Sequence, residues 1–254
     1  MSARLGVNID HVATLREARG ESYPSLENAA EICLESGADQ ITIHLREDRR
    51  HIQDKDVPNI RRITKKKGKL MNLEMGCDPG IMEVALLHKP DWVCLVPEKR
   101  EEQTTEGGLN LIDARNFQKI KECCVRLKDS IPNLKISLFV ESDIPTLEKV
   151  HELGSGLIDA VEIHTGDYAI QYLAQKSVDN FLKEFERAKE FVEEKGIACH
   201  AGHGLTSESV TPLIEKGLFE EYNIGHWIIS ESVFMGLGEV VKSLKALFEG
   251  KERL

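Results

Sequence analysis

The stretch LKISLFVESDIPTLEKVHELGSGLIDAVEIHTG, residues 134–166, contains one complete strand, helix and strand unit. Short runs of β-branched and other apolar residues predict strands over Ile136–Val140 and Ala160–His164. Between them, apolar residues at helical spacing predict a helix over Ile144–Leu153. Two strands joined in this way lie parallel, with the helix packed against their sheet.

The same unit recurs along the rest of the chain. Similar runs predict strands over Leu5–Asp10, Gln40–Leu45, Leu70–Met75, Trp92–Val96, Ile197–His203 and Tyr222–Ile229. Helical periodicity occupies Ser25–Glu35, Val57–Lys66, Pro79–His88, Leu111–Lys128, Val178–Glu194, Ser207–Lys216 and Glu231–Phe248. About eight such units predict closure into a (β/α)8 barrel, the TIM-barrel fold. Because 254 residues suit one such barrel and no flexible linker divides them, we expect a single domain over residues 1–254.

Two connections are longer than a minimal barrel needs. The polar segment Pro97–Asn110 contains Gly107-Gly108, as expected of a mobile lid over an active site. The segment Asp167–Ser177 carries several apolar residues and predicts an additional short helix.

Composition excludes several classes of protein. A net charge of -10 repels nucleic acid and anionic membranes, so an anionic substrate must be held by local donors. The six cysteines form no CxxC pair, which argues against a zinc knuckle or a disulfide framework and favours reduced, mostly buried thiols. No apolar run approaches the roughly 20 residues of a membrane span, and the first residues lack the core of a signal peptide, so we expect a cytoplasmic protein.

Polar residues gather near the carboxyl ends of four predicted strands. Alternate side chains of a parallel strand face the barrel interior, and active sites of such barrels lie at this end. Barrel interiors also contain polar layers that satisfy one another, which is the structural alternative for each residue. Clustered buried ionisable groups are costly, however, and are better explained by chemistry. The pairs on one face are Asn8 with Asp10, Thr42 with His44, Asn72 with Glu74, and Glu162 with His164.

Histidines and glycines add to this pattern. Most of the nine histidines fall in or near strand ends, where imidazoles are suited to proton transfer near neutral pH. The seventh and eighth strands are followed by AGHGLTSES (201–209) and by NIGHWIISES (223–232), each with a Gly beside a His and a Ser-rich helix start. Loops at these places commonly bind phosphate in barrels, which makes Gly204, Gly225 and His226 candidates. The alternative is that the glycines only make turns.

A second set of basic residues follows the first two strands. Arg46 and His51 lie just beyond the strand that carries His44, and Arg19 follows the first strand. A guanidinium group offers a forked contact to phosphate. The intervening run 48–50 is explained equally well as a solvated surface. Two separate anion sites are therefore predicted, which suits two phosphorylated substrates.

Taken together, these segments resemble the pyridoxine 5'-phosphate synthase family over nearly the whole chain. The resemblance rests on GVNIDHVATLREARG (6–20), ITIHLREDRRHI (41–52), MNLEM (71–75), CLVPEKREEQTTEGGLN (94–110), VEIHTGDYA (161–169), AGHGLT (201–206) and NIGH (223–226). It implies a (β/α)8 barrel with extra helices, assembled as a homo-octamer, with neither a cofactor nor a metal. It also implies an enzyme that condenses 1-deoxy-D-xylulose 5-phosphate with 3-amino-2-oxopropyl phosphate.

The resemblance further implies roles for single residues. His44 and Glu74 are similar to proton acceptors of the family, His203 to the proton donor, and Glu162 to an electrostatic stabiliser of the intermediate. The aminoketone phosphate site corresponds to Asn8, Arg19, Gly204, Gly225 and His226, and the deoxyxylulose phosphate site to Asp10, His11, Arg46, His51 and Thr104. One departure is visible, because His200 stands before AGHG where an Asn is expected.

Two rival functions remain open, namely another phosphosugar barrel enzyme, either an aldolase or an epimerase, and a non-catalytic sensor. A phosphosugar aldolase needs a lysine late in a strand, whereas Lys69 and Lys135 lie at strand beginnings. A metal-dependent epimerase would use His11, His44, Glu74 and His164 as ligands. A barrel that only senses phosphorylated metabolites is the alternative from another class.

Overall fold

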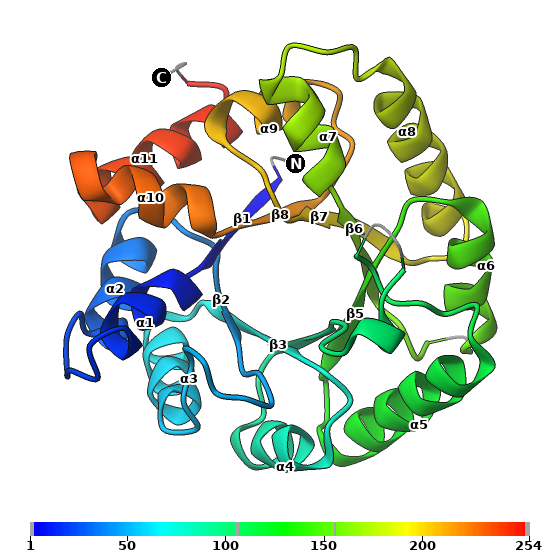
Figure 1. Ribbon diagram of the computed structural model, residues 1–254, viewed down its shortest axis with the longest axis horizontal. Helices are drawn as coiled ribbons and strands as arrows, with labels where there is room; N and C mark the ends of the chain where they lie inside the picture. Colours follow the sequence, from blue (N-terminus) through cyan, green and yellow to red (C-terminus); the bar gives the residue numbers. More distant parts are fainter. Residues whose placement is uncertain (1–2, 105–106, 155, 252–254) are drawn as a thin grey trace.

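The computed structural model describes residues 3–104, 107–154 and 156–251. Its strands pair in parallel, each with the next, and the last pairs with the first, so that they form a closed barrel. Viewed along the barrel axis, the strands form a central ring enclosed by helices (Figure 1). The predicted (β/α)8 fold is confirmed. The strands are β1 (Arg4–Asn8), β2 (Gln40–His44), β3 (Leu70–Met75), β4 (Trp92–Leu95), β5 (Lys135–Val140), β6 (Ala160–His164), β7 (Ala198–Gly202) and β8 (Glu221–Ile224).

Helices form the outer layer and connect successive strands. The helices of this layer are α2 (Leu26–Glu35), α3 (Asp56–Lys67), α4 (Pro79–His88), α5 (Ala114–Ser130), α6 (Ile144–Glu152), α8 (Asp179–Glu193), α9 (Ser207–Glu215) and α11 (Leu237–Phe248). Additional helices follow β1, β6 and β8 directly, at the end of the barrel where active sites lie. They are α1 (Asp10–Glu17), α7 (Gly166–Leu173) and α10 (His226–Met235), of which α7 is the helix predicted within 167–177.

Side chains cap the first turn of several helices that begin close to the strand ends. Asp78 accepts hydrogen bonds from the amides of Gly80 and Ile81, and Pro79 provides the first residue of α4. Thr206 and Ser209 form a reciprocal capping box at the start of α9. Such caps satisfy amide groups that the helix itself leaves unpaired. They keep the βα connections short and so fix the loops around the barrel mouth.

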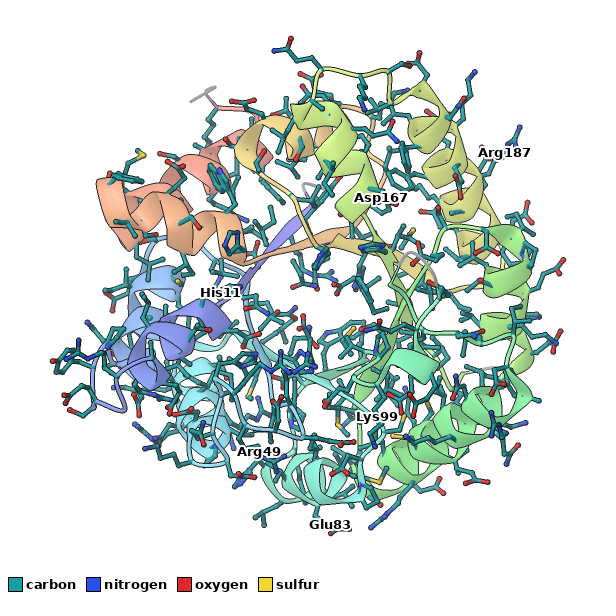
Figure 2. All side chains as sticks on the ribbon, viewed as in Figure 1. His11, Arg49, Glu83, Lys99, Asp167 and Arg187 are labelled. Carbon is teal, nitrogen blue, oxygen red and sulfur yellow. The ribbon has the colours of Figure 1, made fainter. Side chains whose placement is uncertain are left out.

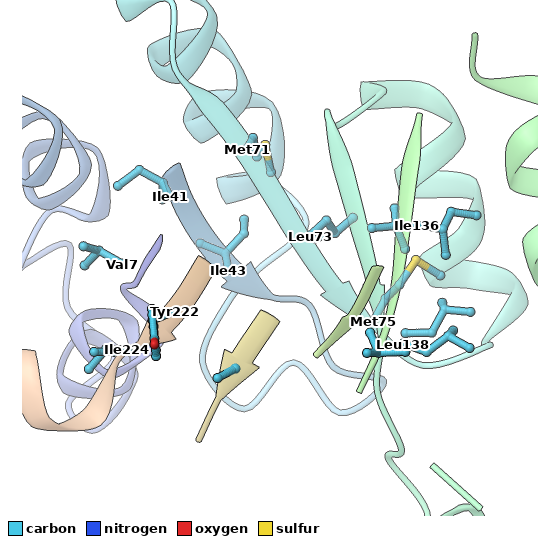
Figure 3. Close-up of a cluster of buried hydrophobic side chains, with 14 of the residues drawn as sticks. Val7, Ile41, Ile43, Met71, Leu73, Met75, Ile136, Leu138, Tyr222 and Ile224 are labelled. Carbon is cyan, nitrogen blue, oxygen red and sulfur yellow. The ribbon is translucent and has the colours of Figure 1, made fainter. Parts of the chain in front are cut away.

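The hydrophobic core lies between the strands and the helices. Outward-facing strand residues such as Val7, Ile41, Ile43, Met71 and Leu73 have no exposed surface. Figure 3 shows them projecting from neighbouring strands into this layer. The alternate residues face the barrel interior and include the polar side chains predicted at the strand ends. This separation confirms the alternation read from the sequence.

Some predicted element bounds were wrong. The eighth strand was predicted to continue to Ile229, but β8 ends at Ile224 and α10 begins at His226. Ile228 and Ile229 resemble strand residues, yet they are buried on a face of this helix. The helix predicted over Glu231–Phe248 is instead divided between α10 and α11 at Gly236, whose φ of 85° an ordinary residue rarely adopts.

The first strand was also predicted too long. It ends at Asn8, and Asp10 already belongs to α1, a helix that the sequence did not reveal. An eight-residue helix that follows a strand after a single residue offers too little periodic sequence to be recognised. The seventh strand is likewise shorter than predicted, running from Ala198 to Gly202.

Other features of the chain bear on the sequence predictions. The cysteines are free thiols, and all are buried except the half-buried Cys77. In the described part of the chain, none of the helices has both the length and the apolar character that crossing a membrane requires. The predicted lid, 97–110, contains a short 3-10 helix, Arg100–Glu102, and an antiparallel bridge between Gln103 and Leu109. Residues 105–106 of that segment lie outside the described residues.

Candidate active site

A cavity of about 740 Å³ opens at the carboxyl ends of the strands. Strand ends and the loops that follow them make its walls, as is usual in barrel enzymes. His11, at the start of α1, lies at the rim of the ring of strands (Figure 2). The cavity brings most of the predicted site residues together, namely Asn8, Asp10, His11, His44, Arg46, Glu74, Glu162, His203, Gly204, Gly225 and His226.

His44 and Glu74 face each other across neighbouring strands. They are register partners at the carboxyl ends of β2 and β3, and Nδ1 of His44 lies 3.9 Å from Oε2 of Glu74. Asn8, at the end of β1, places its Nδ2 3.5 Å from the same carboxylate oxygen. An imidazole and a carboxyl group at this separation can both reach one substrate molecule bound between them.

Two further carboxyl groups hold His44 in place. Asp10 accepts a hydrogen bond of 2.8 Å from the backbone amide of His44, and its other oxygen accepts one from Asn8. On the opposite side, Nε2 of His44 lies 3.4 Å from Oε1 of Glu98. Glu98 also accepts bonds from the amides of Glu47 and Gly76, which fix its carboxylate. The sequence analysis missed Glu98, because nothing within the polar segment 97–110 singles it out.

The electrostatic surroundings give these carboxyl groups different pKa values. Although burial opposes ionisation, the hydrogen bonds from His44 and from two amides lower the pKa of Glu98 to about 2. Burial raises the pKa of Asp10 to about 6 against the opposing effect of His44. Burial, with the charges of Glu162 and Asp10, raises the pKa of Glu74 well above its usual value. These carboxyl groups therefore differ in how readily they release a proton, and such differences are typical of sites that use acid and base groups.

Glu162 lies deeper in the barrel, on β6. Its Oε2 accepts a hydrogen bond of 2.8 Å from Nδ2 of Asn223, a residue of β8 that the sequence analysis did not select. The Oδ1 atom of Asn223 accepts in turn from the Thr42 hydroxyl at 2.9 Å. Burial, with the charge of Glu221, raises the pKa of Glu162 to about 8, although the bond from Asn223 opposes this shift.

The raised pKa of Glu162 predicts a dependence of stability on pH. Because burial raises the pKa from 4.5 to about 8, the folded protein keeps a proton that the unfolded chain releases. The free energy of unfolding therefore falls as pH rises through this window. We expect Glu162→Gln to unfold at a higher temperature than the wild type at about pH 8, with a much smaller difference near pH 5. A difference that is equal at both pH values in thermal unfolding would contradict a raised pKa.

Two glycines make room for the pair of Glu162 and Asn223. A β-carbon on Gly202 would lie 2.1 Å from Oε1 of Glu162, and one on Gly6 would lie 2.0 Å from Oδ1 of Asn223. Both distances are far below van der Waals contact. A larger residue at Gly202 of β7 is therefore incompatible with the observed position of Glu162, and one at Gly6 of β1 with that of Asn223.

We accordingly expect Gly202→Ala to reduce kcat by about a hundredfold, since displacement of a catalytic group by about 1 Å has an effect of this order. The matched control is Gly238→Ala on the outer helix α11, where a β-carbon would lie 3.1 Å from the Ser36 hydroxyl and 3.5 Å from Cγ2 of Ile32. Steady-state rates and circular dichroism of both variants provide the test. A Gly202→Ala protein with the rate of the control would show that the position of Glu162 is unimportant.

His203 occupies a strained position between β7 and α9. Its φ is 79°, which is unusual for a residue with a side chain. The Thr165 hydroxyl lies 2.8 Å from the carbonyl oxygens of both Gly202 and His203 and holds this turn. Burial, together with His164 and His226, lowers the pKa of His203. Strain of this kind is often found where a side chain must be aimed at a ligand.

Helix starts and unpaired donors line the other parts of the cavity. Gly225 precedes α10 and His226 begins it, so the free amides of that helix open toward the cavity. Among the described residues, Nε of Arg46 is buried without a hydrogen-bond acceptor, and the Asp48 carboxylate lies 3.9 Å away. Both features suit an anionic ligand, because a buried donor without a partner is costly.

A family model described as "Pyridoxal phosphate biosynthesis protein PdxJ" matches residues 5–250. The chain belongs to the PdxJ family. Curated relatives support this, and both of those described next are named "Pyridoxine 5'-phosphate synthase". One from Wolbachia is 45% identical over 242 residues, covering 95% of this chain and 97% of the relative. One from Sulfurihydrogenibium is 44% identical, covering 96% and 97%.

Solved structures agree with the fold assigned to this PdxJ family member. A thiamine phosphate pyrophosphorylase from Pyrococcus furiosus superimposes with a TM-score of 0.61 at 15% identity, covering 98% of this chain and 96% of that protein. A phosphoribosylanthranilate isomerase from Thermotoga maritima gives a TM-score of 0.57 at 14% identity, covering 98% and 99%. Identities this low show the shared barrel fold alone.

Three residues predicted from the PdxJ family pattern lie outside the cavity lining. Arg19 is exposed after α1, and Thr104 contacts Glu141 beside the cavity. The His51 ring lies next to the His44 ring, with 6.1 Å between their centroids. Burial, with His44 and Arg46, lowers the pKa of His51 to about 4, so its ring is neutral at physiological pH. Their binding roles stay predictions.

The structure also bears on the rivals to a PdxJ-type reaction. Lys69 pairs with Asp39 at 3.6 Å, and Lys135 lies over the Trp92 ring at the start of β5, so both are at the opposite end of the barrel from the cavity. The cavity lining in the described part of the chain contains no lysine. The proposed metal ligands are not brought together as a set. His44 and Glu74 approach Asp10 instead, with ligand atoms within 4.8 Å of one another.

His200, the departure from the PdxJ family pattern, lies in the barrel interior below the cavity. Its Nδ1 is 3.7 Å from Oε1 of Glu221, and its Nε2 is 3.4 Å from the Arg4 guanidinium. Burial lowers its pKa, which favours the neutral ring. His200 therefore belongs to a buried polar layer and lies outside the cavity lining.

Proposed function

We propose that the protein condenses 1-deoxy-D-xylulose 5-phosphate with 3-amino-2-oxopropyl phosphate to give pyridoxine 5'-phosphate, inorganic phosphate and water. Membership in the PdxJ family supports this function, because the relatives so named align over nearly their whole length. The observation that carries it is the cavity itself, where carboxyl and imidazole groups from several strands meet two candidate anion sites.

The residue types suit the chemistry of ring formation. The amine of one substrate forms an imine with the ketone of the other, after which water and the sugar's phosphate leave and a carbon-carbon bond closes the ring. Each step removes a proton from one atom and delivers one to another. We assign proton acceptance to His44 and Glu74, proton donation to His203, and stabilisation of the charged intermediate to Glu162. The substrate supplies the amine, so no catalytic lysine is required.

The raised pKa values fit a cationic reactant. Burial raises the pKa of Asp10 to about 6 and that of Glu162 to about 8, and it raises the pKa of Glu74 well above its usual value, so Glu162 holds its proton near neutral pH. A protonated amine or imine beside these groups favours their carboxylate forms and lowers their pKa values again. Binding of the aminoketone would thereby convert protonated carboxyl groups into carboxylate bases beside the reacting atoms.

Two phosphate groups would occupy opposite parts of the cavity. The start of α10 suits the aminoketone phosphate, which we assign to Asn8, Arg19, Gly204, Gly225 and His226. The unpaired Nε of Arg46 suits the deoxyxylulose phosphate, which we assign to Arg46 together with Asp10, His11, His51 and Thr104. In this arrangement the retained phosphate belongs to the aminoketone, and the phosphate on the Arg46 side is released.

Further properties follow from the family pattern and belong to the same proposal. They are a single domain over residues 1–254, a homo-octamer located in the cytoplasm, and closure of segment 97–110 over bound substrates. Exposed apolar residues at the end of α10 support self-association, since Val233 and Phe234 are 72% and 84% exposed. Such side chains are usually covered by a partner.

The function is tested by incubating the purified protein with both substrates and with each substrate alone. Formation of pyridoxine 5'-phosphate only from the pair, at the same rate after chelation, supports the proposal. Absence of pyridoxine 5'-phosphate, together with a tightly bound stoichiometric metal, favours the epimerase alternative, with Asp10, His44 and Glu74 as ligands. Binding of either substrate without any turnover favours a metabolite sensor.

A further inference from the structure

Glu141, directly after β5, holds a segment of the predicted lid against the barrel mouth. Its Oε1 accepts a hydrogen bond of 2.7 Å from the amide of Gly108 and one of 3.2 Å from the Thr104 hydroxyl. Within the segment, the Thr104 amide donates to the Gly108 carbonyl at 2.8 Å, and the Gly107 amide donates to the Thr104 hydroxyl at 3.0 Å. One carboxylate oxygen therefore holds both Thr104 and Gly108, which we call the turn of Thr104 and Gly108.

The contact requires close approach of two backbone segments. A β-carbon on Gly108 would lie 2.8 Å from Oε1 of Glu141 and 2.9 Å from both the Glu141 nitrogen and the Val140 carbonyl carbon. Only a glycine lets the segment come this near. The Glu141 side chain is 15% exposed, so water competes little for its oxygen atoms.

The same oxygen of Glu141 also contacts a histidine. Nδ1 of His164, at the end of β6, lies 3.5 Å from it. Burial opposes ionisation of Glu141, yet the contacts with His164, Gly108 and Thr104 lower its pKa below the usual value. A carboxylate at Nδ1 favours the ring form that carries a proton there and fixes the orientation of the imidazole.

The other edge of His164 faces His203. A β-carbon on Gly166 would lie 2.6 Å from Nε2 of His164 and 3.0 Å from Cδ2 of His203, so both rings border the same small space. Their centroids are 5.2 Å apart. Phe139 packs against both rings, with centroid distances of 5.3 Å and 6.3 Å. The orientation of His164 therefore limits the positions open to His203.

We propose that Glu141 is a positioning residue that joins the turn of Thr104 and Gly108 to His164, and through His164 to His203. This role rests on the proposed function, in which His203 is the proton donor. The positions of Thr104 and Gly108 and the orientation of the acid would then depend on one carboxylate. The chemistry would proceed at full rate only with the segment in place.

The proposal is tested with Glu141→Gln, which keeps the size of the side chain and removes its charge. The control is Glu148→Gln on the neighbouring helix α6, an exposed position with the same change of charge. We expect kcat to fall about tenfold or more in Glu141→Gln and to stay within about twofold in the control. His164→Gln should cause a similar loss, and the double variant should lose little more than either single variant.

A second measurement is independent of turnover. In nitrogen-15 spectra of labelled histidine, His164 should carry its proton at Nδ1 in the wild type, and this preference should weaken in Glu141→Gln. An unchanged His164 signal in Glu141→Gln, or losses of kcat that multiply in the double variant, would overturn the proposal. If the wild type itself forms no pyridoxine 5'-phosphate, the proposed function fails, while the spectra still decide whether Glu141 orients His164.

Gly108→Ala keeps the proposal testable if Glu141→Gln does not fold. A β-carbon at this position would clash with the Glu141 carboxylate and with the backbone of Val140 and Glu141, so the contact of Gly108 with Glu141 must lengthen. We expect a loss of kcat of about tenfold in a protein that remains folded by circular dichroism. A Gly108→Ala protein as active as the wild type would show that the contact between turn and carboxylate is unnecessary.

Discussion

Glu74→Gln is expected to lower kcat about a thousandfold, since general acid and base groups contribute roughly 10² to 10⁴ in rate. Glutamine has the same shape as glutamate and can still accept from Asn8, but it cannot take a proton. Burial already raises the pKa of Glu74, so removal of its charge should not destabilise the fold. The measurement is the steady-state rate of pyridoxine 5'-phosphate formation, together with the melting temperature.

The control for Glu74→Gln is Glu190→Gln, an exposed position on α8. This variant should retain the wild-type rate. A thousandfold loss accompanied by an unchanged melting temperature assigns the effect to chemistry rather than to folding. Activity near that of the wild type in Glu74→Gln would end its assignment as a proton acceptor.

The second large effect is expected at His203. His203→Ala should lower kcat by about 10² to 10⁴, because the variant has no group to deliver a proton to the leaving atom. Alanine also fits poorly at a φ of 79°, so part of the loss would come from backbone strain. His203→Asn separates the two effects, since asparagine adopts this backbone conformation more readily.

We therefore expect both His203 variants to be inactive, with a lower melting temperature for the alanine variant alone. Rates and thermal unfolding are measured on the same preparations. If His203→Asn turned over at the wild-type rate, another residue would have to donate the proton. The neighbouring His164 would then be the first candidate, since its ring lies 5.2 Å from that of His203.

The fold could be predicted from local sequence because each strand and helix repeats a simple pattern. Alternation along ITIH and LMNLEM places His44 and Glu74 on the inward face, and the parallel register makes them partners. Prediction failed where two signals competed. Ile228 and Ile229 have β-branched side chains typical of strands, but β8 ends at Ile224 and the chain enters α10 directly after Gly225.

The residues that support the site were harder to predict. Asn223 contacts Glu162 across 61 positions of sequence, and Glu98 contacts His44 across 54. Glu141 accepts a hydrogen bond from the amide of Gly108, which can lie so near only because glycine has no side chain. Such contacts follow from the closure of the barrel and leave no periodic trace in the chain. A glycine that faces the barrel interior, such as Gly6 or Gly202, is a local signal that a side chain from a neighbouring strand occupies the space beside it.

The central claim is that this barrel joins two phosphorylated substrates and retains the phosphate of the aminoketone. The most direct measurement uses 3-amino-2-oxopropyl phosphate labelled with phosphorus-32, incubated with unlabelled 1-deoxy-D-xylulose 5-phosphate and the purified protein. We predict that the label appears in pyridoxine 5'-phosphate, with one unlabelled phosphate released for each product molecule. Label recovered as inorganic phosphate, or the absence of pyridoxine 5'-phosphate, would contradict this account.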